Sequence, residues 1–348
     1  MSSIPAVVQA DADGARQRAR RFGAWLCVYL LLALLLTTMS LVVGTSSVRT
    51  SLSWLLSPEA MSDTVLWQIR LPRALGAWFA GALLGLAGAI AQGVFRNPLA
   101  EPYLLGSASG AALGVTISLL VTDASITGLA WIGQLGLTGA AFAGACGGIA
   151  LTLALSRGTL QTASLLLAGV VVAFLLGAIM SLLLLRSPDT WRAMQSFLLG
   201  TTALLGWRST ILLALVFGAC LLPAALLSRG LDALTLGEDT AQSLGVPLAG
   251  LRLALLGLLS LATAASVSQL GVVGFVGLVA PHLVRESVHV NGRQLVIGAA
   301  LCGGALLQAA DLLSRWMIRP SELPVGIVTA CVGGVYLVLL LWRKAQRA

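Results

Sequence analysis

The polar residues with the most obvious chemical use lie in one short segment, from Leu234 to Val246, between two long apolar runs. The segment carries Glu238 and Asp239 among small and apolar residues, a pattern typical of a short amphipathic helix. The chain has a single lysine, Lys344, so it cannot form the Gly-x-x-x-x-Gly-Lys-Ser/Thr loop that binds nucleotide phosphates. Any ATPase that drives this protein is therefore expected to be a separate chain, and this segment is a candidate surface for docking it.

Within the segment, Gly245 is well placed as a helix C-cap. Leu236, Ala241 and Leu244 can face one side of the predicted helix while Glu238 faces water. Such a helix could insert into a groove of a partner and transmit its movement as a rigid push. A helix lying in the lipid interface is the alternative, but it would need a polar face rich in Lys and Arg, which is absent here. We assign to this coupling loop the residues Leu236, Gly237, Glu238, Ala241, Leu244 and Gly245.

The histidines and cysteines do not indicate an enzyme, a resident metal or a cofactor. His282 stands beside Pro281 without a second ligand at useful spacing, and His289 lies seven residues further on. The cysteines all lie in apolar stretches, where free Cys behaves as a small hydrophobe. They are Cys27, Cys146, Cys220, Cys302 and Cys331. No Ser/His/Asp or paired-carboxylate arrangement suggests catalysis.

Composition places the chain in the bilayer. It is 58% hydrophobic and 10% charged, whereas a soluble domain carries about 25% charged residues. The net charge of +8 could suggest a nucleic-acid partner, but the arginines fall singly or in small groups between apolar runs. We expect no nucleic acid to bind, because orientation in the membrane explains this distribution better.

The apolar runs predict an all-α polytopic membrane protein with about ten transmembrane helices, since a span needs about 20 apolar residues. The eighth run is short and glycine-rich, which predicts a half-helix or a tilted segment. We expect one domain over residues 23–342, with tails at 1–22 and 343–348, and both termini in the cytoplasm according to the positive-inside rule. The predicted spans are 23–44, 73–94, 103–122, 128–155, 162–185, 207–227, 250–268, 272–284, 296–314 and 324–342.

Charged and small residues at the spans suggest specific contacts. Asp311 and Arg315 are four residues apart, which predicts an ion pair on one helix face, although an ionisable group at membrane depth can also be functional. Arg96 and Glu101 lie in a proline-containing turn that we interpret as mainly structural, bracing the contact with the ATPase. Glycines at four-residue spacing predict close helix approach. These are the pairs Gly81/Gly85 and Gly110/Gly114.

Several spaced motifs resemble one family, the membrane permeases of bacterial ABC importers for iron-siderophores, haem and vitamin B12. The motifs are Arg70-Leu71-Pro72-Arg73, Arg96-Asn97-Pro98 with Gly106, Leu236-Gly237-Glu238, Gly274-Phe275-Val276-Gly277 with Pro281-His282, Asp311 with Arg315, and Glu322-Leu323-Pro324. The resemblance implies a type II importer permease in the inner membrane, with ten helices in each protomer. It also implies a homodimer whose interface encloses the translocation path, together with two cytoplasmic ATPases and a periplasmic binding protein.

The resemblance also implies roles for residues outside the coupling loop. Arg70, Arg73 and Arg315 match arginines that meet acidic residues on the two lobes of the binding protein, which suits the forked bonds that Arg makes with carboxylates. Thr162 and Ala163 fall where related permeases narrow the inner exit. The motifs do not distinguish an iron-siderophore, haem or cobalamin as cargo.

Two other classes remain open from the residues alone. An ion-coupled secondary transporter should carry several ionisable groups near the midplane, and this chain offers Asp311 alone. A membrane-embedded enzyme should show a convergent polar cluster, which the sequence does not reveal.

Overall fold

The computed structural model describes residues 6–42, 64–121, 130–156, 162–288 and 290–346, and these ranges contain helices and turns without strands. The elements are α1 (Ala6–Val42), the π-helical turn η2 (Val65–Arg70), α3 (Leu71–Val94), the 3-10 turn η3 (Pro102–Leu105), α4 (Ser107–Val121), α5 (Ala130–Leu155), α6 (Thr162–Leu184), α7 (Pro188–Leu199), α8 (Trp207–Thr235), α9 (Glu238–Ser243), α10 (Leu248–Leu270), α11 (Val276–Ser287), α12 (Gly292–Met317) and α13 (Val325–Ala345).

The predicted membrane class and fold are confirmed, with shorter elements at two of the ten expected spans. Within the described ranges, eight helices are long and apolar enough to cross a membrane. The expected span 103–122 is the turn η3 followed by the 15-residue helix α4. The expected half-helix at 272–284 is α11, which has 12 residues. α7 was not expected as a helix at all.

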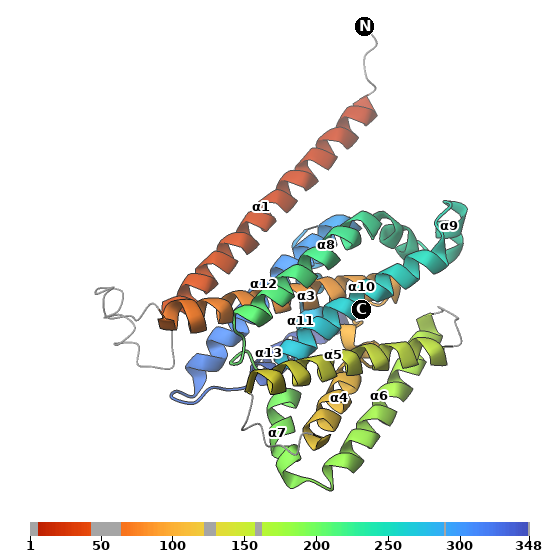
Figure 1. Cartoon of the computed structure of the whole chain (residues 1–348). Helices are drawn as coiled ribbons and strands as arrows, with labels where there is room; N and C mark the ends of the chain where they lie inside the picture. The colour runs from red at the N-terminus through yellow and green to blue at the C-terminus, as the bar shows by residue number, and fades with distance from the viewer. Residues whose placement is uncertain (1–5, 43–63, 122–129, 157–161, 289, 347–348) are drawn as a thin grey trace.

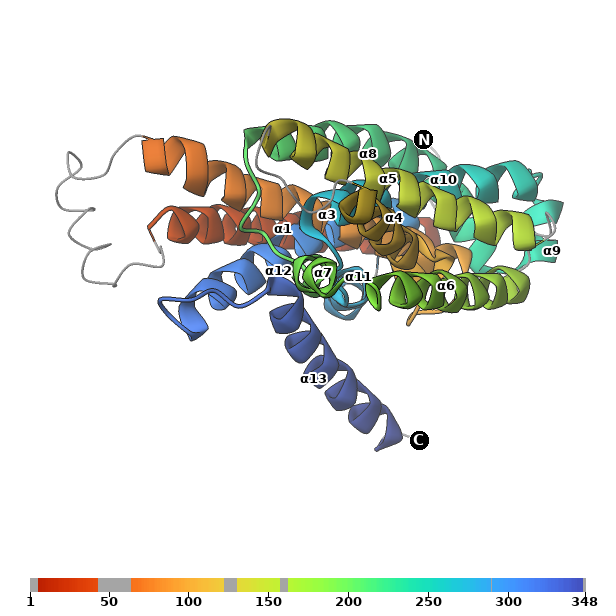
Figure 2. The same ribbon diagram turned by 60° about the horizontal axis from the view of Figure 1, so that its bottom comes forward.

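α3 is the central element of the bundle. Of its 24 residues, 20 are buried, and it packs against α8, α10, α11 and α12 (Figure 1). A second packed group contains α4, α5, α6 and α7. The N-terminal part of α1 projects away from the bundle in Figure 1, whereas Thr37 and Ser40 near its other end bond α12, and α13 projects away in Figure 2. The apolar faces of these two outlying helices are therefore left for lipid or another subunit.

Glycines allow the closest helix crossings. A Cβ atom on Gly85 would overlap the backbone carbonyl of Ala299 where α3 crosses α12, and one on Gly81 would overlap that of Gly303. At the crossing of α4 and α5, a Cβ atom on Gly110 would meet the carbonyl of Gly144 in the same way. The close approach that the glycine spacing predicts is thus confirmed, and it fixes α12 directly against α3.

Candidate functional site

The coupling loop forms a capped helical turn between α8 and α10. Gly245 has φ +77°, its N–H donates to the carbonyl of Gln242 at 2.9 Å, and the N–H of Val246 donates to that of Ala241 at 3.1 Å. These two bonds form a Schellman motif, which satisfies carbonyls at the end of α9. The predicted capping role of Gly245 is therefore confirmed, with Leu244 as the C-cap residue of α9 and Gly245 directly after it.

The three apolar side chains of this loop do not share one face, contrary to the sequence prediction. Ala241 is fully buried, whereas Leu236 is 68% exposed and Leu244 is 64% exposed. Leu236 and Leu244 lie outside the bounds of α9, at the C-caps of α8 and α9. Helical periodicity therefore does not fix their direction, and both present apolar surface beyond the membrane-spanning helices.

Glu238 keeps about a third of its side chain exposed, at 34%, in line with the expectation that it faces water, and it also contacts two arginines of the same chain. Its Oε1 accepts a bond from Nη2 of Arg252 at 2.6 Å and another from Nη2 of Arg96 at 3.0 Å. The hydrogen bond from Arg252 lowers the pKa of the Glu238 carboxyl below its ordinary value. Glu238 is thus ionised at neutral pH and joins α9 to α10 and to the turn after α3.

Sequence reasoning overlooked Arg252, although a signal was present. Arg252 is a single charged residue inside an apolar run, and such residues generally need a partner. Its side chain is 6% exposed. Glu101 was expected, with Arg96, to brace the contact with the ATPase. In the structure its Oε1 accepts the N–H of Phe275 at 2.9 Å. The turn after α3 therefore contacts α9 through Arg96 and the start of α11 through Glu101.

A network of buried charges lies at the opposite end of α3. Nε and Nη2 of Arg73 donate to Oδ1 of Asp311 at 3.0 and 2.9 Å. Nη1 and Nη2 of Arg73 donate to the two oxygens of Glu322 at 3.1 and 2.8 Å. Arg315 lies 2.7 Å from Oδ2 of Asp311, so the predicted ion pair within α12 is confirmed. Two arginines and two carboxylates here compensate one another.

The arginines expected to meet the binding protein are buried within this chain. Arg70, Arg73 and Arg315 are all buried, and Nη1 of Arg70 donates to the carbonyls of Leu41 and Val42. Carboxylates and carbonyls of the same chain enclose these guanidinium groups. That they also meet a partner stays a prediction.

The remaining expected sites have simple positions in the fold. Thr162 is the first residue of α6 and Ala163 is exposed, and their role at an inner gate stays a prediction. His282 lies with Nε2 3.5 Å from Glu286, while His289 is outside the described residues. Across the part of the chain that the structure describes, no group of three or more His, Cys, Asp or Glu side chains could hold a metal ion.

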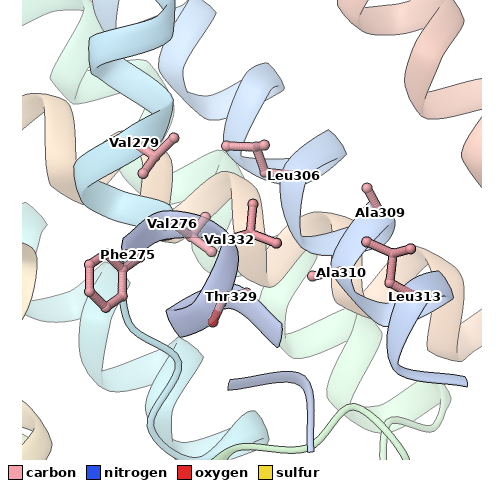
Figure 3. A pocket seen from close by; sticks show the side chains of 10 residues that line it. Phe275, Val276, Val279, Leu306, Ala309, Ala310, Leu313, Thr329 and Val332 are labelled. Atoms are coloured by element: carbon pink, nitrogen blue, oxygen red, sulfur yellow. The ribbon is translucent and has the colours of Figure 1, made fainter. Parts of the chain in front are cut away.

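An apolar pocket lies between α11, α12 and α13, and Figure 3 shows its lining side chains. Thr329 of α13 is the one lining residue with a polar side chain. The others are Phe275, Val276, Val279, Leu306, Ala309, Ala310, Leu313, Val332 and Gly333. The pocket offers shape and apolar contact, without ligands for a bare metal ion.

Comparisons with known proteins match nearly the whole chain. A profile of the FecCD transport family matches residues 30–343. The vitamin B12 import system permease protein BtuC of Salmonella paratyphi A is 36% identical over 334 residues, covering 95% of this chain and 99% of that protein. The protein of the same name from Salmonella typhimurium is also 36% identical over 334 residues, with the same coverage.

Solved structures are similar as well. A metal-chelate type ABC transporter in an inward-facing conformation has a TM-score of 0.78 and 29% identity, over 91% of this chain and 98% of that one. PsaBC from Streptococcus pneumoniae, in complex with Fab, has a TM-score of 0.54 and 15% identity, over 83% and 94% of the two chains. The second similarity concerns the fold alone.

Proposed function

The chain belongs to the FecCD transport family and is the permease component of an ATP-binding-cassette importer, and we propose that its cargo is an iron chelate (siderophore or haem) or cobalamin. The observation that carries this proposal is the combination of family membership over residues 30–343 with similarity to a vitamin B12 permease and to a metal-chelate transporter. The chelate passes whole, because the described residues lack a group of side chains that would bind its metal.

ATP hydrolysis belongs to two copies of a separate cytoplasmic ATPase that dock on the coupling loop. The single lysine, Lys344, excludes a phosphate-binding loop in this chain. The exposed Leu236 and Leu244 supply apolar surface for that contact.

The permease works as a homodimer in the bacterial inner membrane, with both termini in the cytoplasm and the cargo path on the twofold axis. Large apolar side chains are exposed along α6 and α13, which supports burial against lipid and a second copy. A dimer repeats each surface by symmetry, so a periplasmic binding protein with two acidic lobes would meet two equivalent sites. We place these sites near Arg70, Arg73 and Arg315, with Thr162 and Ala163 at the inner exit.

The ion-coupled alternative has less support from the geometry. Asp311, the acidic residue expected within a span, is paired with Arg73 and Arg315. A proton or sodium ion would have to compete with two guanidinium groups for this carboxylate.

Uptake into proteoliposomes tests the assignment. The permease is reconstituted with its ATPase and binding protein, and radiolabelled cobalamin is compared with a set of ferric chelates. We expect uptake of one cargo that requires ATP and survives an uncoupler. Uptake that an uncoupler abolishes, with ATP present, would identify an ion-coupled transporter instead.

A further inference from the structure

We propose that Glu238 is a positioning residue that clamps α9 to the permease through Arg252 and Arg96, while the exposed Leu236 and Leu244 contact the ATPase. This inference rests on the proposed importer function, because the ATPase is the partner that the apolar surface would meet. It assigns the acidic residue of the coupling loop to ion pairs within the permease and the apolar residues to the interface with the ATPase.

Arg252 gives the strongest reason for the inward role of Glu238. Nη2 of Arg252 donates to Oε1 of Glu238 at 2.6 Å, and Nη1 lies 3.5 Å from Oε2. Among the described residues, Nε of Arg252 is buried without a hydrogen-bond partner. A nearly enclosed guanidinium group is costly without a carboxylate, so the charge of Arg252 depends on Glu238.

Arg96 extends the clamp to α3. Its Nη2 lies 3.0 Å from the same Oε1 that Arg252 uses. Arg96 has φ +49°, in the left-handed region that side chains other than Gly seldom adopt. The contact thus fixes α9 to Arg96, which lies in a tight turn just after the end of α3.

The apolar residues have the opposite disposition. Leu236 and Leu244 flank α9 and expose large side chains, next to Gly237 and Gly245, which both have positive φ. These side chains lie between the candidate spans Trp207–Thr235 and Leu248–Leu270, outside the apolar helices. A soluble ATPase is the occupant that fits, since the importer requires one and this chain has no phosphate-binding loop.

The two groups of residues have different roles: the leucines bind the ATPase, and the ion pairs of Glu238 transmit its movement. An ATPase that holds Leu236 and Leu244 displaces α9, and the ion pairs of Glu238 carry this displacement to the ends of α10 and α3. The apolar pair is expected to determine affinity for the ATPase, while the clamp determines how well hydrolysis drives transport.

The first measurement uses the purified permease without any ATPase. Amide hydrogen exchange is compared for wild type, Glu238→Ala and the matched control Asp239→Ala, which removes the adjacent exposed acid. We expect Glu238→Ala to speed exchange in residues 238–252 by about tenfold, as for loss of a charge-assisted hydrogen bond, and Asp239→Ala to leave it unchanged. Equal exchange in all three proteins would overturn the clamp.

The second measurement adds the ATPase. Replacing Leu236 and Leu244 together with Ser should weaken ATPase binding by about tenfold or more, with exchange in residues 238–252 as in wild type. Glu238→Ala should keep ATPase affinity while the cargo moved per ATP falls. If Glu238→Ala loses affinity as strongly as the leucine variant, Glu238 touches the ATPase and the proposal is wrong.

The two measurements distinguish failure of this inference from failure of the importer assignment. If wild-type permease binds no ATPase, the importer assignment and the role of the leucines both fail. The exchange result on the isolated permease would still decide whether Glu238 is a clamp.

Discussion

Glu322 is the most accessible member of the buried charge network, because its side chain is 26% exposed while those of Asp311 and Arg315 are almost fully enclosed. Arg73 bonds Asp311 and Glu322 at once. An acidic partner that reaches Arg73 would therefore replace Glu322 as one of the two carboxylates bound to this arginine. Reversing Arg73 itself is a poor test, since breaking a buried pair costs about 3–5 kcal/mol of stability.

Neutralising Glu322 tests whether an acidic partner can take its place at Arg73. We expect Glu322→Gln to raise the affinity for an acidic binding protein several-fold, because Arg73 then lacks one of its two internal carboxylates. Titration at low ionic strength, where such contacts are strongest, measures the change. Asp189→Asn, which alters an exposed ion pair with Arg192, serves as the control. An unchanged or weaker affinity for the Glu322 variant would mean that Arg73 is purely structural.

The charged residues show which part of a site the sequence can predict. The pairing of Asp311 with Arg315 follows from their spacing on one helix. The pairing of Arg73 with Glu322 joins residues 249 positions apart, and no local pattern encodes it. The same holds for Glu238, whose bond to Arg96 spans 142 positions. Tertiary packing brought these charged groups, distant in the sequence, into ion pairs with one another.

At the level of elements, the crossing of α3 with α12 depends on glycine. We expect Gly85→Ala to destabilise the protein by about 1–3 kcal/mol, as overpacking does, because the added Cβ meets the backbone of Ala299. Thermal unfolding in detergent measures the change. Gly177→Ala in α6 is the matched control, since nothing lies within 4 Å of its Cβ position. It should be neutral or slightly stabilising through helix propensity, and equal losses in both variants would contradict the role of the crossing.

The helices themselves were largely predictable, because apolar runs of membrane length give a strong signal. The exception, α7, is short and carries polar residues among apolar ones, so it resembles a loop when only hydropathy is considered. A local signal was available. Ser187 caps the helix by accepting the N–H of Thr190, and Pro188 occupies its first turn, a combination typical of helix starts.

For the whole molecule, transport of an intact chelate predicts that metal-binding side chains are dispensable. A variant with both histidines replaced by Ala and all five cysteines by Ala or Ser should transport nearly as wild type once expression is matched. Some loss of stability is expected, since Cys220 and Cys302 are buried. Uptake of the identified cargo in proteoliposomes checks this. Loss of transport despite normal assembly, or bare metal bound to the purified permease, would contradict it.

α3 has a consequence for the energetics of the whole importer. Its 24 residues form a rod about 36 Å long at 1.5 Å per residue, with the Arg73 network at one end and the Arg96 contact to α9 at the other. If one rigid helix carries both contacts, docking of the binding protein at one end and binding of the ATPase at the other share a single coupling free energy. That coupling is reciprocal by thermodynamic necessity. Any factor by which nucleotide-bound ATPase tightens or loosens the binding protein must then equal the factor by which the binding protein changes affinity for that ATPase.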